Sequence, residues 1–134
     1  MKLSPYLFLD GQAEAAISLY QRVLGAEVTV LMRFRDNPEP NPMVPPGSEE
    51  KIMHAELRLG TDTLLLSDGM AQGKPRFEGS ALSITVTDPA EAARIFAAMG
   101  EGGRVQMPLG PTFFARSFGM VADRFGVSWM ILAA

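Results

Sequence analysis

The chain has 134 residues, 47% hydrophobic and 20% charged, with a net charge of −3. This is long enough for one domain with a sizeable core, and the composition is typical of an ordinary soluble globular protein. The basic residues are scattered, and no apolar run reaches the ~18–20 residues of a membrane span, so we expect neither nucleic-acid nor membrane binding. Mild acidity is compatible with a cationic small-molecule ligand, although most cytoplasmic proteins are similarly acidic.

Cysteine is missing from the sequence, which excludes disulfides and thiolate metal sites. Its absence fits a cytoplasmic protein. The first ten residues lack the long apolar core and the small-residue cleavage site of a signal peptide. We therefore expect a cytoplasmic location.

The first half of the chain predicts a strand, a helix and three further strands. Apolar residues recur at helical spacing before Gly25, which is typical of a helix C-terminal cap. Elsewhere apolar and polar residues alternate, as in half-buried strands. In chain order the predicted elements are a strand at 3–9, a helix at 12–24, and strands at 27–34, 52–59 and 63–67.

A proline-rich segment, residues 36–50, interrupts this order between the second and third strands. It contains five prolines and few residues that could pack in a core, so we predict a mobile loop. Long loops in small domains are often functional. The segment is interpreted either as a lid or as a tolerated surface insertion.

The second half repeats the order of the first. Asp88 and Pro89 are typical of a helix start, as N-cap and first helical residue. An Ala-Glu-Ala-Ala motif recurs at an offset of 77 residues. The predicted elements are a strand at 81–86, a helix ending at Gly100, and strands at 105–107, 114–122 and 127–132, with 68–79 as linker. We predict an α+β single domain, 1–134, built from two βαβββ modules, 1–69 and 80–134.

Alternation along two strands indicates which side chains line a binding surface. In 52–59 the apolar residues should face the helix, which leaves His54, Glu56 and Arg58 on the other side. In 114–122 one alternate set includes Phe114 and Phe118, although Gly119 could mark a bulge. Two such sheets would form a curved, cup-like mixed sheet, a shape typical of small-molecule sites.

The polar candidates each have a structural alternative. His54 and Glu56 stand two residues apart on one strand face and could act as an acid–base or ligand-binding pair. A structural histidine, hydrogen-bonded within the sheet, is the more common case. Arg58 could bind an anionic group, or it could be a solvated charge at a strand end.

The aromatic candidates are equally open to two interpretations. Phe114 and Phe118, with Phe113 and Trp129, could stack on a planar ligand. Aromatic residues near a C-terminal hairpin more often belong to a core or a dimer contact. Asp123 and Arg124 belong to a predicted turn and are assigned no chemistry.

Six stretches of the chain match one known family pattern: 5–8, 13–16, 20–25, 53–57, 66–68 and 118–131. Through them the chain resembles the PhnB-like branch of the vicinal-oxygen-chelate superfamily, which includes glyoxalase I, bleomycin-resistance proteins and extradiol dioxygenases. The most specific stretch is 118–131, which is similar to the family's ending, with Arg124 where a proline is usual. The resemblance implies paired βαβββ modules in a glyoxalase/bleomycin-resistance-like fold, and commonly a homodimer.

The resemblance also implies where metal ligands would stand, and this chain departs from it there. An acidic ligand four residues after a hairpin glycine would fall on Leu64 and Met130, which bind hard divalent cations poorly. The chain holds a single histidine, whereas a stable site needs three or more His or carboxylate ligands. We expect no metal and no cofactor. Such sequences often carry a ubiquinone methyltransferase name, but no glycine-rich nucleotide loop follows a predicted strand.

Three hypotheses about function remain. The first is a metal-independent module that binds a small organic molecule, with His54, Glu56, Arg58, Phe114 and Phe118 as candidate ligand-binding residues. The second is a metal-dependent lyase or dioxygenase with an atypical site around His54 and Glu56. The third is a mainly structural or regulatory protein.

Overall fold

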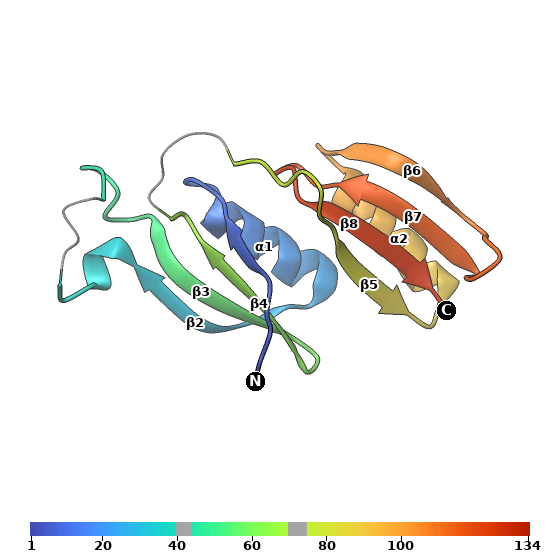
Figure 1. Cartoon of the computed structure of the whole chain (residues 1–134), viewed down its shortest axis with the longest axis horizontal. Helices are drawn as coiled ribbons and strands as arrows, with labels where there is room; N and C mark the ends of the chain where they lie inside the picture. Colours follow the sequence, from blue (N-terminus) through green and yellow to red (C-terminus); the bar gives the residue numbers. More distant parts are fainter. Residues whose placement is uncertain (40–43, 70–74) are drawn as a thin grey trace. The chain divides into compact units, whose positions relative to one another are not determined.

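The computed structural model describes residues 1–39, 44–69 and 75–134. The chain divides into two compact units, Met1–Pro75 and Arg76–Ala134, which are described separately (Figure 1). In the described ranges no helix has both the length and the apolar character needed to cross a membrane.

The first unit is a four-stranded sheet with one helix on one face (Figure 1). The strands lie in the order β1-β4-β3-β2; β1 is parallel to β4, and the other pairs are antiparallel. The helix buries an alanine-rich stripe that includes Ala16 and Tyr20. The elements are β1 (Tyr6–Phe8), α1 (Ala13–Leu24), β2 (Glu27–Arg33), the 3₁₀ helix η1 (Phe34–Asp36), β3 (Ile52–Leu59) and β4 (Asp62–Ser67).

The second unit has the same topology. Its strands lie in the order β5-β8-β7-β6, with β5 parallel to β8, and its helix packs against the sheet through Ala92, Ile95 and Met99. The elements are β5 (Leu82–Val86), α2 (Pro89–Gly100), β6 (Arg104–Gly110), β7 (Ser117–Ala122) and β8 (Ser128–Ala133). The predicted α+β class and the two βαβββ modules are confirmed.

The residue offset between corresponding strands of the two units is constant through the first half of each unit and is smaller in the second half. The 77-residue offset carries Glu27–Arg33 onto Arg104–Gly110, so β2 and β6 correspond along their full length. Leu66 of β4 lies opposite Leu7, and Ile131 of β8 lies opposite Ile84, so the offset between β4 and β8 is 65 residues. The change falls between the second and third strands, where the first unit holds the proline-rich segment and the second holds only a short loop.

Two of the four ends of α1 and α2 obey the local capping rules that the sequence predicts. Gly25 adopts a left-handed conformation, with φ of 68°, and Asp88 accepts a hydrogen bond from Ala90 N at 2.9 Å, as predicted. The start of α1 has no local side-chain cap. Asp68, distant in sequence, supplies it instead by accepting a hydrogen bond from Ala13 N at 3.0 Å.

Three predicted strand boundaries were wrong. β1 covers only Tyr6–Phe8, and β7 begins at Ser117 instead of Phe114. β6 extends from Arg104 to Gly110, well beyond the predicted 105–107. The β7–β8 ladder runs without a break through Gly119, and the irregularities lie in β6 instead.

Gly119 is required for packing. A Cβ there would lie 2.7 Å from Phe96 of α2 and 3.0 Å from the Cα of Leu109 in β6. The glycine therefore allows α2 and the edge strand to approach β7 closely.

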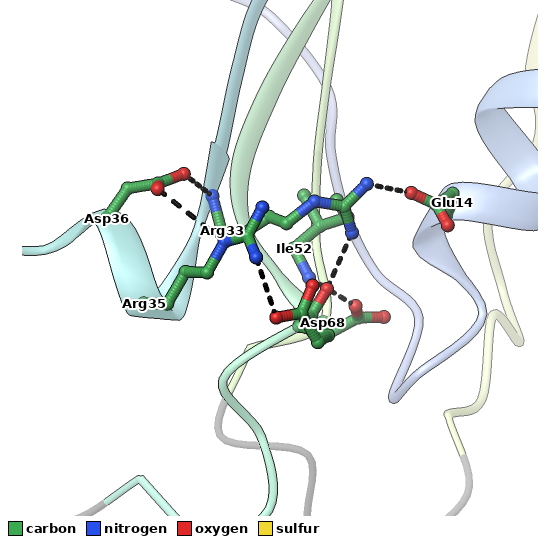
Figure 2. A network of polar contacts seen from close by, with 7 residues as sticks. Glu14, Arg33, Arg35, Asp36, Ile52 and Asp68 are labelled. Atoms are coloured by element: carbon green, nitrogen blue, oxygen red, sulfur yellow. Dashed lines mark hydrogen bonds and ion pairs between the residues drawn. The ribbon is translucent and has the colours of Figure 1, made fainter.

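The two ends of the proline-rich segment are held together by polar contacts (Figure 2). Arg33 pairs with Glu14 of α1 and donates to the carbonyl of Glu50 at 2.6 Å. Arg35 forms an ion pair with the Glu50 carboxylate at 2.9 Å. The base of this segment is therefore ordered against α1, which the prediction of a mobile loop did not anticipate. Residues 40–43, at its centre, lie outside the described residues.

Candidate functional site

The face of the first sheet opposite α1, here called the open face, carries the polar residues of β3. Ala55 and Leu57 are completely buried on the helix side. Because side chains alternate along a strand, His54, Glu56 and Arg58 point to the open face. This confirms the predicted division of β3 into two faces.

Strand pairing brings β1 onto the same surface. Tyr6 lies opposite Leu65 of β4, and Leu65 lies opposite Glu56 of β3. The hydroxyl of Tyr6 is 2.7 Å from His54 Nδ1. Tyr6 also stacks against Phe8, with ring centroids 5.0 Å apart. The open face thus has an aromatic edge along β1 beside the polar residues of β3.

His54 lies between two polar partners. Its Nε2 is 3.8 Å from the Glu56 carboxylate, and its Nδ1 faces the Tyr6 hydroxyl. In the neutral tautomer with the proton on Nε2, Nδ1 accepts the Tyr6 proton and the N–H points toward Glu56. Both side chains are partly exposed, His54 at 26% and Glu56 at 34%. The result is an ordered but solvent-accessible polar chain, Tyr6–His54–Glu56.

The environment of Tyr6 keeps its phenol protonated. Partial burial is the largest cause that raises the pKa of Tyr6 above 10.0, a hydrogen bond with Ser67 opposes it, and the nearby Glu56 charge raises it further. Tyr6 therefore acts as a hydrogen-bond donor over the whole physiological pH range.

Arg58 shares the open face but has its own partner. Its guanidinium pairs with Glu27, which lies directly opposite it on β2. The interpretation of Arg58 as a charge at a strand end fits this pairing better than a role as an anion-binding group.

The aromatic candidates lie in the second unit. Phe118 is 8% exposed on β7, and Phe114 packs edge-to-face against it with ring centroids 5.1 Å apart. Phe114 stands in the loop before β7, at 52% exposure, and Phe113 beside it is fully exposed. Arg116 does not line a strand face; it donates to the carbonyl of Ala134 at 2.6 Å. Phe113, Phe114 and Phe118 form an aromatic cluster in the second unit, whereas the Tyr6–His54–Glu56 chain belongs to the first.

The donors present do not fit a divalent metal site. Across the described ranges, no three histidine, cysteine or carboxylate side chains gather closely enough to hold an ion. The ligand position expected at Leu64 is off by one residue, because the strand register buries Leu64 on the helix side. Leu65, opposite Tyr6, is the open-face counterpart of Met130, opposite Ser83. Neither side chain is a good ligand for a hard cation.

Tyr6 and Phe8 also belong to the candidate site, although neither is among the site residues predicted from the sequence. The strand pairing makes them the aromatic edge of the open face. Their alternation around the buried Leu7 was the available signal. A Cβ at Gly69 would lie 3.0 Å from the Phe8 ring, so this glycine leaves room for the ring.

Two buried aspartates were also missed, and both are structural. Asp68 is 3% exposed and accepts hydrogen bonds from the backbone N–H groups of Gly11, Ala13 and Ile52. Asp123 is 2% exposed and accepts from Trp129 Nε1 at 2.9 Å. The predicted start of the linker at Asp68 was therefore wrong, because this side chain belongs to the core of the first unit.

Comparison with known proteins identifies close relatives along the whole chain. Protein YjdN of Escherichia coli K12 is 36% identical, over 98% of this chain and 94% of its own length. The crystal structure of protein PA1353 from Pseudomonas aeruginosa matches with a TM-score of 0.87 and 43% identity, over 99% of this chain and 97% of that one.

A second solved structure carries a functional name. The putative 3-demethylubiquinone-9 3-methyltransferase, PhnB protein, from Bacillus cereus matches with a TM-score of 0.85 and 26% identity over the full length of both chains. A glyoxalase/bleomycin resistance protein from Albidiferax ferrireducens shares the fold, with a TM-score of 0.63, 17% identity and 98% of each chain covered.

The sequence profile described as 3-demethylubiquinone-9 3-methyltransferase matches residues 1–132. This chain therefore belongs to that family, and it has the fold of the glyoxalase/bleomycin resistance protein.

Proposed function

We propose that the chain binds a small organic molecule on the open face of the first sheet, without the help of a metal ion. The observation that carries this proposal is the Tyr6–His54–Glu56 chain beside the exposed ring of Phe8. Small-molecule sites combine apolar or aromatic surface with a few positioned polar groups. The open face supplies both within one unit.

The arrangement favours binding over a purely structural role for His54. A structural histidine would satisfy both ring nitrogens within the protein. Here Nδ1 has a close partner, whereas Nε2 is 3.8 Å from Glu56, beyond hydrogen-bond distance. A ligand oxygen or nitrogen could bind to Nε2 and to the Glu56 carboxylate together.

The metal-dependent lyase or dioxygenase has less support. His54 and Glu56 would supply two ligands, and Tyr6, whose phenol stays protonated, is a poor third. A nucleotide-dependent methyl transfer has no support in the site geometry either, because the open face presents side chains of strands instead of a glycine-rich loop at a helix start.

A thermal-shift screen tests the proposal. Wild-type protein in chelator-treated buffer is screened against a library of small aromatic compounds, and each stabilising compound is titrated into three variants. His54→Ala and Tyr6→Ala remove parts of the proposed site. Val105→Ala shortens an exposed apolar side chain of β6 that is not among the candidate ligand-binding residues, and it serves as the control.

We expect stabilising compounds to lose affinity by about tenfold in the His54 and Tyr6 variants, equivalent to about 1.4 kcal/mol. The affinity for Val105→Ala should stay within about twofold of wild type. Equal binding to all variants would contradict the site. Stabilisation that requires stoichiometric zinc, nickel or manganese would favour the metal-dependent alternative.

A further inference from the structure

The charges on the open face of the first sheet are unbalanced. Register places three charged side chains on this face of the strands, those of Glu27, Glu56 and Arg58. Glu27 and Arg58 neutralise each other in a direct ion pair. In the part of the chain that the structure describes, Glu56 has no ion pair with an arginine or a lysine. The open face therefore presents one carboxylate without a permanent cation.

The arginines of β2 and β3 are engaged elsewhere. Arg58 is directed along the sheet to Glu27, and Arg33 is directed to Glu14 on the helix side (Figure 2). When its ring is neutral, His54 accepts the Tyr6 proton at Nδ1 and adds no positive charge beside Glu56. A bound anion would have to approach this charge with no arginine or lysine to attract it.

The aromatic edge beside Glu56 suits a cation as well. Tyr6 and Phe8 are stacked, 38% and 56% exposed, and their rings border the polar chain. Aromatic ring faces attract organic cations through their quadrupole, most strongly where water is partly excluded. Met32, opposite His54 on β2, adds an adaptable apolar surface on the other side.

We propose that the ligand of this site is a small organic cation with an aromatic ring, whose ammonium group pairs with Glu56 and whose ring packs on Tyr6 and Phe8. This inference rests on the proposed function and narrows it to one chemical class. It assigns Glu56 as the residue that decides ligand charge, and the β1 aromatic residues as the surface that decides ligand shape.

The test compares isosteric ligands of different charge. The probes are 4-hydroxyphenyltrimethylammonium, its neutral isostere 4-tert-butylphenol and the anion 4-hydroxybenzoate, each titrated by calorimetry and by amide chemical-shift perturbation. The proteins are wild type, Glu56→Gln and Glu101→Gln. Glu101 is exposed at the end of α2 and is not among the residues of the proposed site, so its variant makes the same change in net charge in the second unit.

We expect wild type to bind the ammonium probe about tenfold more tightly than the neutral isostere, with shift changes at Tyr6, Phe8 and His54. Glu56→Gln should abolish this preference, while Glu101→Gln should retain it. Tighter binding of the neutral or anionic probe, an unchanged preference in Glu56→Gln, or no binding of the ammonium probe at millimolar concentration would each overturn the inference.

The two proposals fail in different ways. If the library screen finds neutral or anionic ligands whose binding depends on His54 and Tyr6, the binding site stands and the inferred cation class is wrong. If ligands bind the His54 and Tyr6 variants as tightly as they bind wild type, the proposed site is wrong. The inferred preference for a cation is then wrong too.

Discussion

The hydroxyl of Tyr6 lies 2.7 Å from Nδ1 of His54, although the two residues are 48 positions apart in the sequence. The contact spans β4, which separates their strands in the sheet. It exists because β1 pairs in parallel with β4 in a register that sets Tyr6 opposite Leu65. This relationship makes the first strand part of the candidate site.

The raised pKa of Tyr6 predicts a late phenol titration. The difference between the ultraviolet titrations of wild type and Tyr6→Phe should show one phenol with a pKa above 10.0. Since the folded state favours the neutral phenol, this contribution to stability is complete below the unfolded pKa. It should be lost as the pH rises through the folded pKa.

Glu56→Gln provides the control for this titration. Removing the nearby negative charge should lower the pKa of Tyr6 toward its ordinary value, although burial should keep part of the rise. A phenol that titrates at or below the ordinary value in wild type would contradict the described surroundings of Tyr6.

The close packing around Gly119 predicts a destabilising substitution. In Gly119→Ala the new Cβ would meet Phe96 at 2.7 Å and backbone atoms of Leu109 near 3.0 Å, so α2 or β6 must shift. We expect a loss of about 2–3 kcal/mol in the free energy of unfolding, measured by urea denaturation.

Gly110→Ala, on the neighbouring strand β6, is the matched control. A Cβ at Gly110 meets nothing within 4 Å, so the change should stay within about 0.5 kcal/mol. Equal effects of the two substitutions would mean that the contact of Gly119 with α2 and β6 is not the cause.

Asp68 predicts a second structural effect. Its two carboxylate oxygens accept hydrogen bonds from Gly11, Ala13 and Ile52, which join the start of α1 to the start of β3. In Asp68→Asn one oxygen becomes an NH₂ group that faces backbone donors. We expect a loss of about 3 kcal/mol in the free energy of unfolding.

Asp62→Asn makes the same change in charge at an exposed position of β4. The free energy of unfolding from urea denaturation should change by no more than about 0.5 kcal/mol. If both variants lose the same stability, net charge and not the buried hydrogen bonds would explain the result.

We expect a homodimer, which the resemblance seen in the sequence implies. Light scattering after size-exclusion chromatography should give about twice the 14.5 kDa mass of one chain. A mass that stays at one chain over a wide concentration range would contradict this prediction.

Local patterns in the sequence determined the element order, both modules and the two faces of β3. Helical and alternating periodicities depend on residues a few positions apart, and caps such as Gly25 and Asp88 act on their own helix. His54 and Glu56 were identified on the same basis, because residues two apart on a strand share a face.

Only the tertiary structure decided which distant residues meet. The Tyr6–His54 contact, the Arg58–Glu27 pair and the capping of α1 by Asp68 all join segments far apart in the chain. Each depends on strand order and register, which are selected by the packing of the whole unit. Residue types near one another in sequence do not specify these partners, because the same alternating strand could pair with several neighbours.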